Sequence, residues 1–143
     1  GMRKRGVMRA VFQTPHGTFH LINTHLSVYK LERTIQLKFL FCWLGLSASP
    51  SNEAIILCGD LNAGPSSLVY DTCSRHLNDV QYAFCPSRQH PSTFHAKRPV
   101  FRIDHIFVSE HFKPLWVDVV RNTKTVEASD HLPLIADLIY KSK

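Results

Sequence analysis

Short apolar segments separated by Pro, Gly and Ser recur along the chain, and their spacing predicts a mixture of strands and helices. The first two segments flank the sequence TPHG, in which Pro15 and Gly17 favour a turn, so we expect a β-hairpin. The apolar run AIIL is typical of a strand that is buried on both faces. The predicted strands are residues 7–13, 19–25, 54–58, 102–109, 115–121 and 132–140.

Two helices are predicted between these strands, over residues 31–46 and 66–75, with Ser66 as the N-cap of the second. We expect the buried face of the first helix to consist of residues spaced three and four apart: Leu31, Ile35, Phe39, Cys42, Trp43 and Leu46. Residues 39–46 are apolar all round, so this end of the helix is predicted to be buried on both sides or to meet another chain. Residues 76–100 lack periodicity and are predicted to form a long loop. The order of elements favours an α+β fold, a layered sandwich with mixed sheets.

Composition narrows the class of protein. The chain has 143 residues, 44% of them apolar and 20% charged, which is typical of one soluble globular domain spanning residues 1–143. No apolar run approaches the roughly 18 residues of a membrane-spanning helix, and the basic start of the chain lacks the apolar core of a signal peptide. The four cysteines form no C-x-x-C pair, so we expect reduced thiols and a cytoplasmic location.

The charge balance favours anionic partners. Lys and Arg total 17 against 11 Asp and Glu, giving a formal net charge of +6. Such a balance suits nucleic acid or phosphorylated headgroups. The basic residues are scattered along the chain, however, so a generally basic surface explains the charge equally well.

Polar side chains stand where four of the predicted strands begin or end, in the segments NTH, GDLN, RIDH and SDH. Side chains two apart in a strand point the same way, so Asn23 and His25 can face one cleft, and so can Asp60 and Asn62. Asp104 lies inside an apolar segment, where a carboxylate needs a partner such as histidine. Each segment alone is ordinary, because Asp-x-Asn is common in turns and caps. Their joint occurrence points to a site.

Together the segments INTHL, CGDLN, RIDHIFVS and ASDHLPL resemble the later motifs of the endonuclease/exonuclease/phosphatase superfamily, the deoxyribonuclease-like metal-dependent phosphodiesterases. The resemblance covers about residues 7–140. The sequence around STF and SDHLPLIADL is most similar to that of bacterial hydrolases of this superfamily whose substrates are poorly assigned. It implies in-line attack of water on a phosphoester, assisted by Mg²⁺ or Mn²⁺ bound through oxygen ligands.

The resemblance also implies a role for each matching residue. His131 would activate the water, with Asp104 orienting it, and Asp60 and Asp130 would bind the metal or its water. His25 would contact the scissile phosphate, and Asn62 would donate its amide to a phosphate oxygen. The residues expected to support substrate binding are Asn23, Arg102, Thr93 and Phe94.

One part of the superfamily pattern is missing. Its members begin with a half-domain that carries an Asn and a metal-binding Glu, whereas Glu32, Glu110 and Glu127 lie outside predicted strands. The chain therefore resembles the C-terminal part of a longer enzyme, in which metal binding and turnover would be weak. The exposed apolar surface of such a part leads us to expect self-association.

Three functions remain open at this point. The first is a metal-dependent phosphoester hydrolase, with nucleic acid, phospholipid headgroups and inositol phosphates as substrate classes. The second is a catalytically dead remnant that binds phosphate or nucleic acid and self-associates. The third is a folded fragment whose only property is dimer formation.

Overall fold

The chain folds around a mixed five-stranded sheet, in a computed structural model that describes residues 4–46, 52–87 and 89–141. Its strands follow the spatial order β1 (Val7–Thr14), β2 (Gly17–Thr24), β3 (Ala54–Asp60), β5 (Asp104–Val108) and β4 (Asn78–Asp79). The β1–β2 hairpin is antiparallel, β2 and β3 are parallel, and β5 is antiparallel to both β3 and β4. The mixed α+β class expected from the sequence is confirmed.

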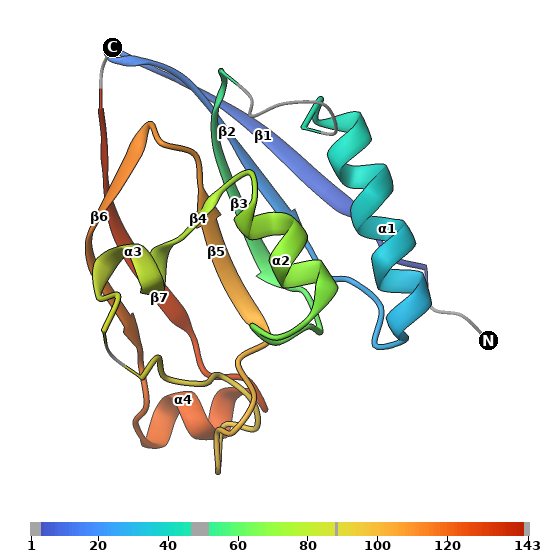
Figure 1. Cartoon of the computed structure of the whole chain (residues 1–143). Helices are drawn as coiled ribbons and strands as arrows, with labels where there is room; N and C mark the ends of the chain where they lie inside the picture. Colours follow the sequence, from blue (N-terminus) through green and yellow to red (C-terminus); the bar gives the residue numbers. More distant parts are fainter. Residues whose placement is uncertain (1–3, 47–51, 88, 142–143) are drawn as a thin grey trace.

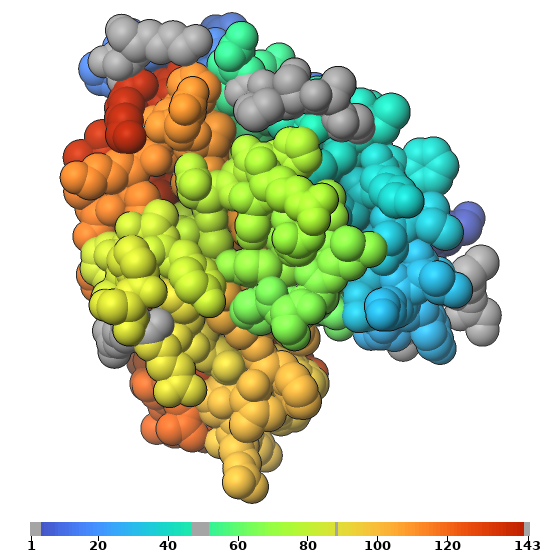
Figure 2. Space-filling view, in the orientation of Figure 1, coloured from blue at the N-terminus to red at the C-terminus, as the bar shows by residue number. Residues whose placement is uncertain are grey.

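Two helices, α1 (Lys30–Trp43) and α2 (Leu68–Ser74), cover one face of this sheet (Figure 1). Alternate strand residues supply the sheet's share of the core on this face, because side chains two apart in a strand point the same way. Ile22, Ile55 and Leu57 are fully buried there, together with Phe107 of β5. In the space-filling view, α1, α2 and α3 (Val80–Phe84) lie on the visible side of the molecule (Figure 2).

The opposite face of the sheet packs against a separate two-stranded antiparallel sheet of β6 (Phe112–Val119) and β7 (Leu134–Tyr140). Aromatic rings join the two layers. The ring of Phe19 on β2 meets those of Phe112 and Tyr140 edge-on, with centroids 5.7 and 6.0 Å away. The layered sandwich predicted from the order of elements is therefore present, and its two sheets enclose the second part of the core.

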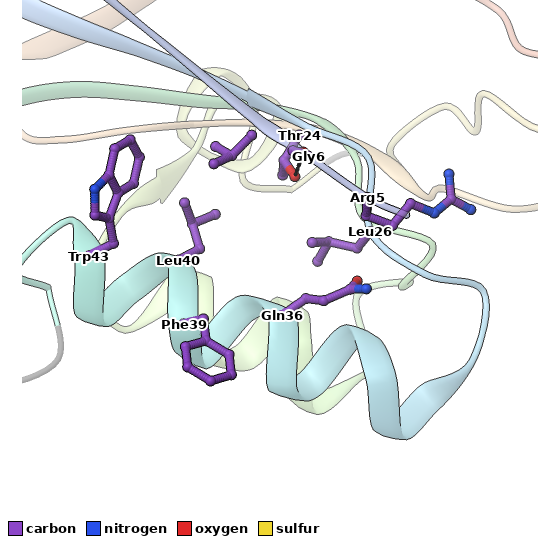
Figure 3. A pocket seen from close by; sticks show the side chains of 9 residues that line it. Arg5, Gly6, Thr24, Leu26, Gln36, Phe39, Leu40 and Trp43 are labelled. Carbon is purple, nitrogen blue, oxygen red and sulfur yellow. Dashed lines mark hydrogen bonds between the residues drawn. The ribbon is translucent and has the colours of Figure 1, made fainter. Parts of the chain in front are cut away.

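The predicted buried face of the first helix is wrong except for Leu46, which is fully buried just beyond the end of α1. Leu31, Ile35, Phe39 and Trp43 are all more than half exposed, whereas Leu37, Leu40 and Phe41 pack into the core. Both sets of residues have helical spacing, so periodicity alone could not decide which one faces the sheet. Figure 3 shows the resulting groove of about 340 Å³ between α1 and the end of the hairpin, where Leu40 and Trp43 face the strands and Phe39 points away. Self-association through this apolar surface stays a prediction.

The structure also changes several element boundaries. The predicted loop over residues 76–100 contains β4 and α3, because the side chain of Asp79 caps α3 by accepting from the backbone N–H groups of Gln81 and Tyr82. Ser67, not Ser66, caps α2. A further helix, α4 (Thr123–Ala128), begins with a capping box formed by Asn122 and Thr125 and was not predicted. No helix in the described residues is long and apolar enough to cross a membrane.

Candidate functional site

Three segments that are distant in sequence meet at one edge of the central sheet. Asp60 is the last residue of β3, and it pairs directly with Asp104, the first residue of β5. The loop between α4 and β7 (Figure 1) contains His131, and an isolated backbone bridge joins His131 to Phe94. Carboxylate and imidazole atoms of Asp60, Asp104 and His131 all lie within 4.8 Å of one another. The sheet register thus brings together the residues for which the motifs predicted a common site.

Asp104 holds His131 in a defined orientation. Its Oδ2 lies 2.8 Å from Nδ1 of His131 and accepts a hydrogen bond from the Thr93 hydroxyl at 2.5 Å. Partial burial alone would lower the pKa of His131, but the hydrogen bond to Asp104 and the charges of Asp104, Asp60 and Asp130 outweigh burial, so the pKa is raised. The carboxylate therefore both fixes the ring and makes it a stronger base.

The other ring nitrogen of His131 faces Asp60. Oδ2 of Asp60 lies 3.9 Å from Nε2 of His131 and 3.3 Å from Nε2 of His25. Burial raises the pKa of Asp60, and the nearby charge of Asp104 adds to this, against the hydrogen bond from Asn62 and the two histidines. The negative charges of Asp60 and Asp104 disfavour each other. A divalent cation bound between them would relieve this repulsion. Asp60 therefore fits a Mg²⁺ or Mn²⁺ ligand.

Gly59 permits the close approach of β2 and β3 that places His25 beside Asp60. Its φ is +132°, and a Cβ at this position would lie 1.9 Å from the carbonyl oxygen of Thr24. Just beyond, the backbone N–H of Leu26 donates to the carbonyl of Asp60 at 2.9 Å. Only glycine satisfies both the left-handed backbone and the missing space.

Asn62 lies beyond the end of β3 at Asp60, so the alternation of side chains in a strand does not apply to it. Its φ is +48°, a left-handed conformation that Asn tolerates better than most residues. Its backbone N–H donates to Oδ1 of Asp60 at 2.7 Å, and its Nδ2 donates to the carbonyl of Leu26 at 2.9 Å. One amide hydrogen remains for a substrate oxygen. Asn62 therefore also clamps the loop that carries Asp60.

Three other predicted site residues lie outside this cluster. Asn23 is exposed on β2 and donates to Sγ of Cys58 at 3.4 Å. Asp130 is exposed, and it contributes its backbone carbonyl to the N–H of Ala96 at 2.7 Å. Among the described residues, the side chain of Asp130 does not belong to the cluster of possible metal ligands formed by Asp60, Asp104 and His131. Arg102 lies two residues before β5 (Asp104–Val108) and is buried.

Arg102 belongs to a buried polar network beside the site. Its Nε donates to Gln81 and its Nη2 to Asp79, and its guanidinium lies over the rings of Tyr70 and Tyr82, about 5.5 Å from their centroids. Burial opposes the charge of Asp79, but bonds and charges from His105 and Arg102 prevail and lower the pKa of Asp79 to about 2. This network was not predicted, because residues 76–100 lack periodicity and were expected to form a loop.

Two residues were not described correctly from the sequence, Thr93 and Glu53. Thr93 was expected to line the substrate side, yet it is 1% exposed and bonds to Asp104. Glu53 was overlooked as a candidate ligand. It precedes β3, at the opposite end of the strand from Asp60, and lies 3.6–3.7 Å from His20 and Arg9. The sequence STF before RIDH was the only signal for Thr93.

Comparison with known proteins agrees with this geometry. The model of the endonuclease/exonuclease/phosphatase family matches residues 3–131. The chain belongs to this family. Among curated proteins no relative matches the chain.

Solved structures with the same fold are longer. An endonuclease/exonuclease/phosphatase from Bacteroides vulgatus is 22% identical, with a TM-score of 0.78 over 96% of this chain and 56% of its own. A mannosyl-6-phosphatase from Bacteroides thetaiotaomicron is 28% identical, with a TM-score of 0.69 over 86% and 52%. The human Nocturnin catalytic domain is 21% identical, with a TM-score of 0.70 over 96% and 53%. The chain thus spans little more than half the length of these proteins.

Proposed function

We propose that this chain carries the catalytic half-site of a Mg²⁺- or Mn²⁺-dependent phosphoester hydrolase. The observation that supports this most directly is the convergence of Asp60, Asp104 and His131 on one sheet edge, with His131 oriented by Asp104. Family membership supports the same reaction class. The net charge of +6 suits a phosphorylated substrate.

Each residue at the edge has a distinct task in this proposal. Nε2 of His131 takes the proton of the attacking water, and Asp104 stabilises the imidazolium that forms. Asp60 would hold a divalent cation, with Asp130 beside it, and such a cation would supply positive charge to offset the charge of the phosphate. His25 lies within reach of the same space and protonates the leaving oxygen, and Asn62 donates its remaining amide hydrogen to a phosphate oxygen.

Two of the similar structures bear on the class of substrate. A relative that is 28% identical is a mannosyl-6-phosphatase, which favours a phosphate ester of a small organic alcohol. A TDP2 structure from D. rerio contains a single-strand DNA product, but at 17% identity it supports only the fold. We therefore place sugar phosphates ahead of nucleic acid among the substrates to be tried.

Hydrolysis assays test the proposal. A generic phosphodiester, a hexose phosphate and plasmid DNA are incubated with the chain in Mg²⁺ or Mn²⁺, with EDTA as the metal-free arm. Cleavage should require metal and should be lost in Asp60→Asn and His131→Ala. Asp71→Asn is the matched control, because Asp71 is exposed and is paired with Arg75 on the surface of α2. Cleavage that survives EDTA or Asp60→Asn would refute the proposal.

A further inference from the structure

The Asp-His dipeptide at the start of β5 sends its two side chains to opposite faces of the sheet, as neighbouring residues of a strand do. Asp104 contacts His131 on one face. His105 lies on the other face, where its ring centroid is 5.2 Å from that of Tyr70 in α2, and it is only 1% exposed. The proton transfer proposed above uses Asp104 but gives no task to His105.

The ring of His105 has an acceptor beside each nitrogen. Nε2 lies 2.8 Å from the carbonyl oxygen of Ala63. Because a carbonyl oxygen can only accept, Nε2 carries a hydrogen and donates it. On the other edge of the ring, Nδ1 lies 3.6 Å from Oδ2 of Asp79, whose carboxylate also pairs with Arg102. His105 is therefore held from the helix layer while it donates to the loop that follows β3.

Ala63 belongs to the loop that carries the acidic edge of the site. This loop leaves β3 through the left-handed backbone of Asn62, whose φ is +48°. Nδ2 of Asn62 ties the loop to the chain beyond β2. On the side of β5, the N–H of Leu61 donates to the carbonyl of Ile103 at 2.9 Å, and His105 donates to Ala63. The loop is thus fastened to the strands on both of its sides.

The bond between His105 and Ala63 is shielded from water, since Ala63 is 2% exposed. Loss of the donor would leave a buried carbonyl unsatisfied, which favours a movement of the loop toward another partner. Such a movement would reach Asp60, because its Oδ1 accepts from the N–H of Asn62, one residue before Ala63.

We propose that His105 is a positioning residue for the loop of residues 60–63. By donating to Ala63, it keeps the carboxylate of Asp60 where Oδ2 lies 3.9 Å from Nε2 of His131. The consequence for cation binding rests on the function proposed above, whereas the conformation of the loop can be measured without metal or substrate.

Three variants test this role. His105→Phe keeps an aromatic ring but removes the donor, and His105→Gln retains an N–H near the position of Nε2. His111→Phe is the matched control, because His111 is also a buried histidine, 8% exposed, whose Nδ1 bonds to the Ser109 hydroxyl beyond the other end of β5. Circular dichroism verifies that each variant is folded, and urea denaturation measures its loss of stability.

NMR provides the metal-free measurement. In the native chain, Nε2 of His105 should carry a hydrogen. His105→Phe should shift the backbone amide resonances of residues 60–64 and accelerate hydrogen exchange at Leu61 and Asn62. His105→Gln should restore most of the native values, and His111→Phe should leave them unchanged. If His105→Phe does not fold, the native ring still decides, because an Nε2 without hydrogen would overturn the proposal.

Calorimetry with Mg²⁺ provides the second measurement. His105→Phe should weaken Mg²⁺ affinity by about tenfold, which is the smaller end of the effect of residues that orient metal ligands. His105→Gln should recover most of this loss, and His111→Phe should show none. Equal effects of His105→Phe and His111→Phe, or a Gln variant no better than the Phe variant, would overturn the proposal. A native chain that binds no Mg²⁺ would count against the proposed function instead, and the metal-free NMR data would then decide the role of His105.

Discussion

Nδ1 of His131 lies 2.8 Å from Oδ2 of Asp104, although 27 residues separate them in the chain. This bond leaves Nε2 of the same ring facing Oδ2 of Asp60, 3.9 Å away. One carboxylate thus orients the imidazole, while the other lies on its reactive side. The two aspartates are neighbours because β3 and β5 pair in register.

Asp104→Asn should lower the pKa of His131, because it removes a charged partner that helps raise it. In the native chain, protonated His131 stabilises the fold. That contribution is complete below the pKa of a histidine in the unfolded chain, about 6.5, and is lost as the pH rises through the higher folded value. NMR titration of the His131 ring without metal, in the native chain and in the variant, measures the two pKa values to be compared. In the variant the acid limb of the rate profile should move to lower pH, and the maximal rate should fall by roughly 10²-fold. An unchanged His131 titration would contradict this.

Thr93 should act as a positioning residue through its bond to Asp104. Thr93→Val keeps the buried volume but removes the hydroxyl, so we expect kcat to fall about tenfold with KM little changed. Thr93→Ser retains the hydroxyl and should restore most of the rate. If Val and Ser variants lose the same activity, or if KM alone rises, the bond to Asp104 has no role in positioning His131.

Much of the candidate site could be located from the sequence, because Asp60 ends a strand, Asp104 begins one and His131 lies in the loop before another. Asp60, Asp104 and His131 stand in short polar segments beside apolar runs, and local pattern reveals such positions. The conformation of Asn62 was not predictable from strand alternation, since the chain leaves the strand at Asp60. Arg102 was equally ambiguous, because its partner Asp79 lies 23 residues away in an aperiodic segment.

Two Asp–Arg pairs offer a matched test of burial. Asp79 and Arg102 are paired in the interior, whereas Asp71 and Arg75 are paired on the surface of α2. Asp79→Ala leaves a buried guanidinium without its partner and should cost about 3–5 kcal/mol in the free energy of unfolding. Asp71→Ala should cost less than about 1 kcal/mol. Urea denaturation measures both, and equal losses would contradict the buried network.

The same network should govern unfolding in acid. Because the pKa of Asp79 is lowered to about 2, its charge stabilises the native state at pH values above the ordinary range of about 3.9. This contribution is lost as the pH falls from there toward 2. The chain should therefore lose stability steeply between roughly pH 4 and 2. Asp79→Asn lacks this titrating carboxylate. Urea denaturation at each pH should therefore show a shallower loss of its unfolding free energy between about pH 4 and 2 than in the native chain.

Helix α1 shows why its buried face could not be predicted from periodicity. Apolar residues occupy both sides of α1, and only the sheet decides that Phe41 is 3% exposed while Phe39 is 72% exposed. Phe41→Ala should therefore cost about 3–5 kcal/mol. Phe39→Ala should change stability by no more than about 0.5 kcal/mol. Thermal denaturation of the pair distinguishes the two faces, and a costly Phe39→Ala would indicate that this surface is covered in solution.

Metal binding at Asp60 should appear as stability even where turnover is slow. The pKa of Asp60 is raised, so its ionised form costs folding energy at neutral pH, and this cost disappears as the pH falls and the carboxylate is protonated. Asp60→Asn should consequently raise the melting temperature in EDTA. In the native chain, Mg²⁺ at 100 times its Kd should add about 2.7 kcal/mol, and the variant should lose that gain. Glu53→Gln, at the opposite end of β3, should keep it. Equal stabilisation of native chain and Asp60→Asn by Mg²⁺ or Mn²⁺ would place the metal elsewhere.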